Sequence, residues 1–226
     1  MKPTHPGGKA TRILVVDDHP LVRQGLSDLL RREPDFEVTG EAASHGEALQ
    51  AMEKTRADLV IVDLSLKDSH GLELIKDIRA RFPAARVLVV TVHDEMLYAD
   101  RALRAGAAGY LTKDEATYRV VEAVRQVLRG EFVVSPKIAA QMASRLAQHT
   151  SGGEVSGRER LSGRELEILE LIGEGLSRQR IAARLRLDVN TVETYRGRIR
   201  EKLQLKDANE LLQYAIRAHR SQDSGI

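Results

Sequence analysis

Short apolar runs, each bounded by polar or turn-forming residues, recur through the first part of the chain. Residues 13–16, 59–62 and 86–90 have the length and nearly unbroken apolar character of strands that are covered on both faces. Residues 36–39 and 109–112 predict two weaker strands. Apolar residues at helical spacing follow each run and predict helices over about residues 21–30, 46–56, 71–78, 96–105 and 114–128. This alternation predicts a parallel, doubly wound α/β sheet with right-handed crossovers.

The second part of the chain shows only helical patterns. A predicted helix over residues 136–148 precedes a Gly- and Ser-rich hinge at residues 150–157. Beyond the hinge, Ser162, Ser177 and Asp188 stand where N-cap residues are expected. The helices that would begin after Ser177 and Asp188 are separated by a turn of about three residues, as a helix-turn-helix requires. The second has a predicted buried stripe made of Val192, Tyr195, Ile199 and Leu203.

Length and composition favour a folded protein of two domains. The chain has 226 residues, of which 42% are hydrophobic and 30% charged. No apolar stretch approaches the ~20 residues that span a bilayer, and residues 1–12 form a polar leader without a signal-like apolar core. Because there are no cysteines, disulfides and thiolate metal sites are excluded. We therefore expect a cytoplasmic protein with no membrane partner.

The charge distribution is more informative than the net charge of +2. Between residues 176 and 206 only Asp188, Glu193 and Glu201 oppose a block of nine basic side chains. The nine are Arg178, Arg180, Arg184, Arg186, Arg196, Arg198, Arg200, Lys202 and Lys206. A local basic block in a chain that is otherwise nearly neutral predicts an anionic partner, nucleic acid before membrane.

Reactive side chains stand at the carboxyl ends of four predicted strands: Asp17 with Asp18, Asp63, Thr91 and Lys113. Because these strand ends meet at one edge of an open α/β sheet, we expect the side chains to converge there. Adjacent carboxylates repel each other unless a cation lies between them, and Mg²⁺ prefers carboxylate oxygens. In this setting Asp63 can act as a nucleophile toward phosphorus, while Lys113 and Thr91 can contact phosphoryl oxygens.

The segments that carry these side chains resemble the receiver domain of bacterial two-component response regulators over about residues 10–130. They are Val-Val-Asp17-Asp18, Val-Asp63-Leu, Val-Thr91-Val and Tyr110-Leu-Thr-Lys113. The resemblance implies a flavodoxin-like (βα)5 fold and phosphotransfer to Asp63 from a phosphohistidine on a sensor histidine kinase. It implies a Mg²⁺ (or Mn²⁺) ion held by Asp17, Asp18, Asp63 and the backbone carbonyl of Ser65. It also implies that Thr91 and Tyr110 reorient together on phosphorylation, and it gives His93 no role.

Two other classes of protein fit this sheet edge less well. A haloacid-dehalogenase-type phosphatase also phosphorylates an aspartate, but its nucleophile strand carries Asp-x-Asp, whereas the two acids here are adjacent. A flavodoxin-like flavin binder needs a phosphate-cradling loop rich in Ser, Thr or Gly after the first strand. The sequence Asp17-Asp18-His19-Pro20 would repel a phosphate unless a metal intervened.

Motifs in the second domain resemble the LuxR-type helix-turn-helix over about residues 158–220. They are Leu161-Ser-Gly-Arg-Glu165, Gly175-Leu-Ser177, Ile181-Ala182-x-x-Leu185, Thr191-Val192 and Ile199-x-x-Lys202-Leu203. Together with the receiver motifs, they make the chain resemble a NarL/FixJ-type response regulator. Three residues depart from the family pattern: Tyr195 stands where His is frequent, and Glu193 and Gly197 stand where some members have a base-contacting Lys.

We expect the second helix of this motif to enter the major groove of double-stranded DNA. Its predicted DNA-contacting residues are Asn190, Thr191, Glu193, Thr194, Arg196, Gly197, Arg198 and Arg200. Among these, the arginines would neutralise phosphates, whereas Glu193 and Thr194 would face base edges. Gly197 lies inside a predicted helix, where glycine lowers helix stability by up to ~1 kcal/mol relative to alanine. Close approach of the helix backbone to DNA would explain it, and so would a substitution that evolution has tolerated without selecting it.

The sequence thus predicts a receiver domain at residues 10–130, a linker at 131–157 and a helix-turn-helix domain at 158–221. We expect a transcription regulator and not an enzyme, apart from self-phosphorylation and dephosphorylation at Asp63. Phosphorylation would control homodimerisation and sequence-specific DNA binding. A competing interpretation is a protein-interaction module whose basic helical domain binds a protein partner.

Overall fold

The computed structural model describes residues 10–66, 69–148 and 160–223. The chain divides into two compact units, residues 1–150 and 151–226. Most of the predicted leader and the hinge at residues 150–157 lie outside the described residues. Within the described ranges, no helix is both long and apolar enough to cross a membrane.

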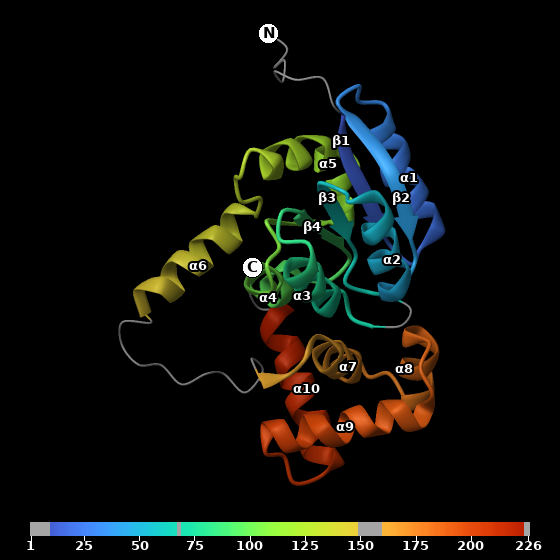
Figure 1. Cartoon of the computed structure of the whole chain (residues 1–226). Helices are drawn as coiled ribbons and strands as arrows, with labels where there is room; N and C mark the ends of the chain where they lie inside the picture. Colours follow the sequence, from blue (N-terminus) through green and yellow to red (C-terminus); the bar gives the residue numbers. More distant parts are fainter. Residues whose placement is uncertain (1–9, 67–68, 149–159, 224–226) are drawn as a thin grey trace. The chain divides into compact units, whose positions relative to one another are not determined.

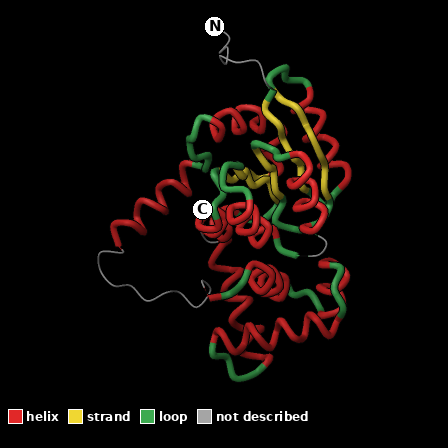
Figure 2. Tube along the Cα trace, in the orientation of Figure 1, coloured by secondary structure: helices red, strands yellow, loops and turns green. Residues whose placement is uncertain are grey.

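The first unit is built on a five-stranded parallel sheet in the order β2-β1-β3-β4-β5 (Figures 1 and 2). The strands are β1 (Thr11–Val16), β2 (Phe36–Ala42), β3 (Leu59–Val62), β4 (Arg86–Thr91) and β5 (Gly109–Thr112). All four residues of β3 are buried, as the unbroken apolar run predicts for a central strand. This order is that of a flavodoxin-like sheet, so the predicted fold class is confirmed.

Helices cover both faces of the sheet. They are α1 (Pro20–Arg31), α2 (His45–Thr55), α3 (Gly71–Arg81), α4 (Glu95–Ala105) and α5 (Lys113–Leu128). Contacts place α1 and α5 on one face and α2, α3 and α4 on the other. One apolar residue of the helix predicted over residues 21–30 does not face the sheet. Leu21 is 85% exposed, because the stripe that packs on the sheet runs through Leu26 and Leu30, and Leu21 points away from it.

The segment after α5 adds backbone hydrogen bonds to the free edge of β5. The amide of Val133 donates to the carbonyl of Ala108 at 3.1 Å, and the amide of Tyr110 donates to the carbonyl of Val133 at 2.7 Å. Gly109 permits this approach, because a Cβ there would lie 2.9 Å from Val133 Cβ. Helix α6 (Pro136–Gln148) then packs against α4. Residues 131–148, which the sequence assigns to the linker, therefore belong to the first unit.

The second unit is all helical over its described residues, as predicted. Its helices are α7 (Gly163–Gly173), α8 (Arg178–Leu185), α9 (Val189–Leu203) and α10 (Ala208–Asp223). Helix α7 packs against α10 and α9, and α8 packs against α9. In α9, Val192 and Ile199 are buried, but Tyr195 and Leu203 are only half-buried, so the predicted stripe is narrower than expected.

Candidate phosphorylation site and nucleic-acid interface

Three carboxylates converge at the carboxyl edge of the sheet, as the strand-end residues predict. Asp17 and Asp18 follow β1 and Asp63 follows β3, and all three are buried. Lys113, the first residue of α5, places its Nζ 2.7 Å from Asp17 Oδ2 and 2.7 Å from Asp63 Oδ2. The strand predicted at residues 109–112 is β5, and the helix predicted from residue 114 begins one residue earlier, at Lys113, because Thr112 forms a capping box with Glu115 and starts the helix.

The charges at this edge do not balance. Three carboxylates face one ammonium group, and burial, followed by the negative charge of Asp63, raises the pKa of Asp17. Burial opposes the charged form of Lys113, but Asp63 and Asp17 outweigh that effect and raise its pKa. Carboxylate oxygens from Asp17, Asp18 and Asp63 lie within 4.8 Å of one another. A hard divalent cation such as Mg²⁺ or Mn²⁺ fits this set of buried oxygen donors.

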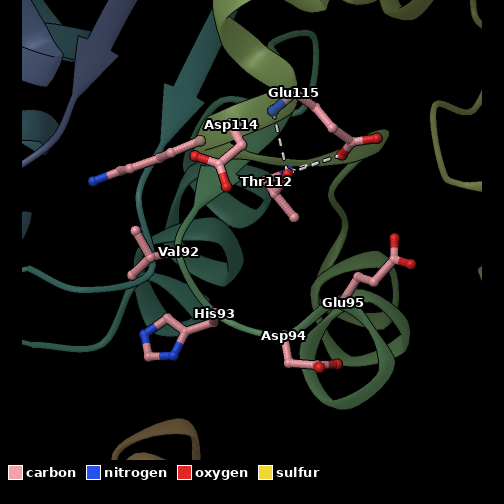
Figure 3. A pocket seen from close by; sticks show the side chains of 8 residues that line it. Val92, His93, Asp94, Glu95, Thr112, Asp114 and Glu115 are labelled. Atoms are coloured by element: carbon pink, nitrogen blue, oxygen red, sulfur yellow. Dashed lines mark hydrogen bonds between the residues drawn. The ribbon is translucent and has the colours of Figure 1, made fainter. Parts of the chain in front are cut away.

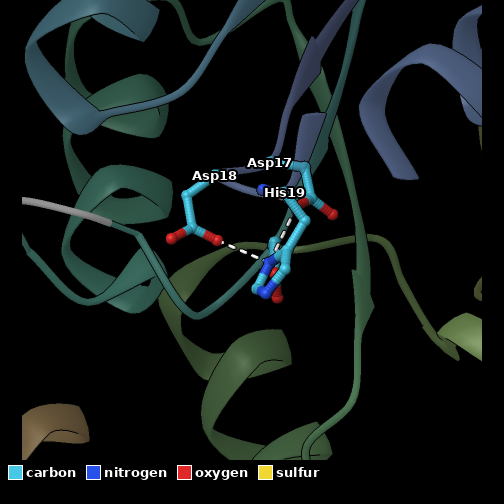
Figure 4. A group of neighbouring side chains, drawn as sticks. Asp17, Asp18 and His19 are labelled. Atoms are coloured by element: carbon cyan, nitrogen blue, oxygen red, sulfur yellow. Dashed lines mark hydrogen bonds and ion pairs between the residues drawn. The ribbon is translucent and has the colours of Figure 1, made fainter. Parts of the chain in front are cut away.

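His19 belongs to the same cluster, although the sequence analysis assigned it no ligand role (Figure 4). Its Nδ1 lies 2.7 Å from Asp18 Oδ1 and 3.5 Å from Asp17 Oδ1. Its backbone amide also donates to Asp17 Oδ1 at 2.7 Å. The only sequence signal for this residue is its position next to the acidic pair, and the side chain remains more than half exposed.

Ser65 and Gly71, which both follow β3 in the chain, hold the backbone around Asp63. The amide of Ser65 donates to Asp63 Oδ1 at 3.3 Å. Gly71, which the sequence marks only as a helix start, is required by a close approach, since a Cβ there would lie 2.3 Å from the carbonyl oxygen of Asp63. Its amide donates to Leu64 O at 2.8 Å. The proposed metal contact through the Ser65 carbonyl remains a prediction.

Thr91 and Tyr110 are both buried, and both contact the backbone of His93. The Tyr110 hydroxyl donates to the His93 carbonyl at 3.0 Å, and the His93 amide donates to Thr91 Oγ1 at 3.5 Å. The imidazole Nε2 of His93 lies 2.9 Å from Ser65 Oγ. His93 therefore connects the two predicted switch residues to the loop that follows Asp63. The sequence could not indicate the contacts with Thr91 and Tyr110, because the backbone atoms of His93 make them.

A cavity of about 310 Å³ opens beside this network (Figure 3). Its lining comes from the loop after β4 and the start of α5: Val92, His93, Asp94, Glu95, Thr112, Lys113, Asp114 and Glu115. Lys113 thus lines the cavity and also contacts the buried carboxylates of Asp17 and Asp63.

The second unit presents the predicted helix-turn-helix as α8 and α9 (Figure 1). The turn between them contains Arg186 in the left-handed conformation, with a φ of 53°, and ends at the α9 cap residue Asp188. The eight predicted DNA contacts fall into two groups. Asn190, Glu193, Thr194 and Arg198 are exposed, whereas Thr191, Arg196, Gly197 and Arg200 are half-buried.

Contacts on α9 fix several of these side chains. Glu193 Oε2 lies 3.4 Å from an Arg178 nitrogen and 3.5 Å from Arg196 Nε. Burial lowers the pKa of Arg196, and the neighbouring positive charges of Arg178 and Arg200 act in the same direction. The guanidinium of Arg198 lies 5.7 Å from the ring centroid of Tyr195, one of the three residues that depart from the family pattern.

Comparisons with known proteins agree with this architecture. Residues 13–125 match the response regulator receiver domain, and residues 159–215 match the bacterial regulatory proteins of the luxR family. The oxygen regulatory protein NreC of Staphylococcus haemolyticus is 37% identical over 210 residues, which cover 91% of this chain and 97% of NreC.

Solved structures of RcsB are similar to this chain over nearly its whole length. RcsB from Salmonella enterica serovar Typhimurium, bound to promoter rprA in the presence of the phosphomimetic BeF3−, is 26% identical. That alignment covers 92% of this chain and 98% of RcsB, with a TM-score of 0.56. A structure of two RcsB dimers bound to two parallel DNAs is also 26% identical. That alignment covers 91% of this chain and 98% of the RcsB chain, with a TM-score of 0.53.

A buried acidic edge on a flavodoxin-like sheet, followed by a helix-turn-helix, defines a regulator of transcription. The chain belongs to the two-component response regulators with a LuxR-type DNA-binding domain, the NarL/LuxR family that its motifs predict.

Proposed function

We propose that a sensor histidine kinase phosphorylates Asp63 in a Mg²⁺-dependent reaction, and that phosphorylation controls dimerisation and sequence-specific DNA binding. The observation that carries this proposal is the pairing of Lys113 Nζ with both Asp17 and Asp63 inside a buried cluster of carboxylates. The proposed metal ligands are Asp17, Asp18, Asp63 and the Ser65 carbonyl. When bound, the metal supplies positive charge that offsets the charge of the transferring phosphoryl group.

In the proposed transfer, a carboxylate oxygen of Asp63 forms the new bond to phosphorus, and the phosphorus–nitrogen bond of the donor phosphohistidine breaks. Lys113, which now bonds Asp63 Oδ2, would then bond a phosphoryl oxygen. The hydroxyl of Thr91 would bond another. Hydrolysis of the aspartyl phosphate returns the site to its starting state, so self-phosphorylation and dephosphorylation are the only reactions we assign to this chain.

We propose that movement of Thr91 changes the position of His93, whose carbonyl accepts the Tyr110 hydroxyl. The receiver response would therefore reach β5, whose edge pairs with the segment that leads to α6. A ligand shifts a two-state equilibrium only through contacts that differ between the states, and the new phosphoryl oxygens provide such contacts.

The DNA-binding surface we propose is the exposed side of α9, with the eight residues named above. The promoter in the RcsB complex and the dimers of RcsB on DNA support a duplex partner and a dimer for this chain. One small module buries little DNA surface, so specific binding is expected to need paired half-sites. Our domain assignment keeps the receiver at residues 10–130, the linker at 131–157 and the DNA-binding domain at 158–221.

A gel-shift assay on duplexes selected from a random pool tests both domains together. With Mg²⁺ and acetyl phosphate, the wild-type chain is expected to enrich paired half-sites and to bind them more tightly than without acetyl phosphate. Asp63→Asn is expected to show no increase. A chain that enriches no DNA sequence under either condition would favour the alternative, a basic module that binds a protein.

A further inference from the structure

Two neighbouring polar side chains on the exposed side of α9, those of Glu193 and Thr194, already have partners within the protein. The carboxylate of Glu193 is paired with Arg178 on α8 and with Arg196 one turn further along α9. The hydroxyl of Thr194 donates to the carbonyl of Asn190 at 2.9 Å. A base edge that reached the middle of this helix would therefore meet a carboxylate held by arginines and a threonine whose hydroxyl is already bonded.

Two features remain available to a ligand at this position. The first is the γ-methyl of Thr194, since the hydroxyl on the same carbon serves the helix backbone. The second is the open space at Gly197, where an added Cβ would meet no atom within 4 Å. Residues three apart are neighbours on a helix surface, so the methyl and the open space lie side by side. The packing of the chain itself thus gives no reason for glycine at 197.

Thymine is the base whose major-groove edge carries a methyl group. We propose that Thr194 and Gly197 together read a thymine methyl in each half-site, and that Glu193 positions Arg178 and Arg196 instead of contacting a base. The absence of a side chain at 197 lets the methyl approach the helix, and the Thr194 methyl packs against it. This inference rests on the proposed DNA-binding function and names the chemical group that the helix recognises.

Replacing single thymines by deoxyuridine tests the proposal, because that exchange removes only the methyl group. The full-length chain, phosphorylated with acetyl phosphate, is titrated with its selected duplex and with each single thymine-to-uracil version. We expect one position per half-site at which uracil weakens binding about fourfold, the effect of burying one methyl-sized group. Uracil at the other thymines is expected to leave the affinity unchanged.

Matched variants assign that effect to residues. Thr194→Val keeps a γ-methyl and should keep the fourfold preference, whereas Thr194→Ser keeps the hydroxyl, loses the methyl and should abolish the preference. Gly197→Ala should bind the uracil duplex at least as well as the thymine duplex. Because alanine favours helix and its Cβ meets no neighbour, the same variant should also raise the melting temperature of the protein. Loss of DNA affinity with a gain in thermal stability separates this effect from misfolding.

Glu193→Gln keeps the shape of the side chain and removes the charge that holds the arginines. Under the proposal it weakens binding to the selected duplex and to single-base variants by the same factor. Relaxed preference at one cytosine would show instead that Glu193 reads a base. An enriched sequence without any thymine-to-uracil effect, or Thr194→Ser with the wild-type preference, would overturn this inference alone. A selection that enriches no sequence would overturn the proposed function as well.

Discussion

Asp63 lies in surroundings that favour a covalent or ionic partner for its carboxylate. The side chain is buried, bonds Lys113 Nζ through one oxygen, and accepts the Ser65 amide through the other. Asp17 and Asp18 add two more carboxylates nearby, so the cluster carries more negative than positive charge. This imbalance distinguishes Asp63 from the exposed acids of the same unit, whose charges are solvated.

The first prediction is that Asp63 is the sole phosphoacceptor. After incubation with Mg²⁺ and acetyl phosphate, the intact mass of the wild-type chain should increase by one phosphoryl group. Asp63→Asn should gain none, because an amide oxygen is a poor nucleophile. Asp94→Asn, which changes an exposed acid in the neighbouring loop, is the matched control and should label fully. Full labelling of Asp63→Asn would contradict the assignment.

The second prediction concerns the metal. Because burial and Asp63 raise the pKa of Asp17, the folded state holds a proton that the unfolded chain releases, so the metal-free protein should lose stability as the pH rises through that pKa. Mg²⁺ bound at the proposed site would offset the same repulsion. At ten times its dissociation constant, it should stabilise the protein by about 1.4 kcal/mol, or a few degrees in melting temperature.

Asp18→Ala should remove most of this Mg²⁺ effect, whereas Asp94→Ala should retain it. Differential scanning fluorimetry at neutral pH, with and without Mg²⁺, measures both. An equal increase in melting temperature for Asp18→Ala and the wild type would place the ion elsewhere.

The third prediction is that Thr91→Ala separates phosphorylation from output. The variant keeps Asp63 and Lys113 and should still accept a phosphoryl group, but it lacks the hydroxyl that would contact the new oxygens. Phosphorylation should therefore raise its DNA affinity much less than in the wild type. Thr91→Ser keeps the hydroxyl and should respond like the wild type in the same gel-shift assay. Full activation of Thr91→Ala would exclude this route.

At the level of single residues, the sequence predicts the acidic edge because its side chains follow recognisable strands. It misses His93, whose contacts to Thr91 and Tyr110 are made by backbone atoms that any residue would supply. The base-reading role that the sequence assigns to Glu193 stays a prediction. The sequence could not indicate its ion pair with Arg178, because that pair depends on how α8 packs on α9, whereas Arg196 lies three residues further along the same helix.

Among the elements, periodicity predicts the central strands more accurately than the edges. The end of β2 at Gly40–Ala42 was not expected, since glycine and glutamate disfavour strands and pairing with β1 holds them there. The pairing of the Val133 segment with β5 was also unforeseen. A free strand edge exposes backbone groups, and this segment covers part of it.

The fourth prediction follows from that pairing. Gly109→Ala should destabilise the first unit by ~1–3 kcal/mol, because its Cβ would lie 2.9 Å from Leu88 Cδ1 and 2.9 Å from Val133 Cβ. Gly25→Ala is the matched control: it lies on the exposed side of α1, its Cβ meets nothing, and it should stabilise the helix by up to ~1 kcal/mol. Urea denaturation of both variants gives the two free energies. A neutral Gly109→Ala would show that the segment moves aside freely.

In the whole molecule, the proposed phosphoacceptor edge and the helix proposed to contact DNA belong to different compact units. The communication that we propose between them is a coupling free energy between two binding sites, and such a coupling is reciprocal. Beryllofluoride, named as the phosphomimetic in the RcsB complex, makes this coupling measurable at equilibrium, because it binds without being hydrolysed. A covalent phosphoryl group that is continually lost would not allow the same comparison.

The fifth prediction is that beryllofluoride with Mg²⁺ and the selected duplex raise each other's affinity by the same factor. If beryllofluoride strengthens DNA binding tenfold, saturating duplex should strengthen beryllofluoride binding tenfold, a coupling of about 1.4 kcal/mol. Titration calorimetry with and without the partner ligand measures both factors. A scrambled duplex of equal length is the control, and Thr91→Ala should bring both factors close to one. If beryllofluoride strengthened DNA binding greatly while the duplex left the affinity for beryllofluoride unchanged, the two ligands would not share one conformational equilibrium.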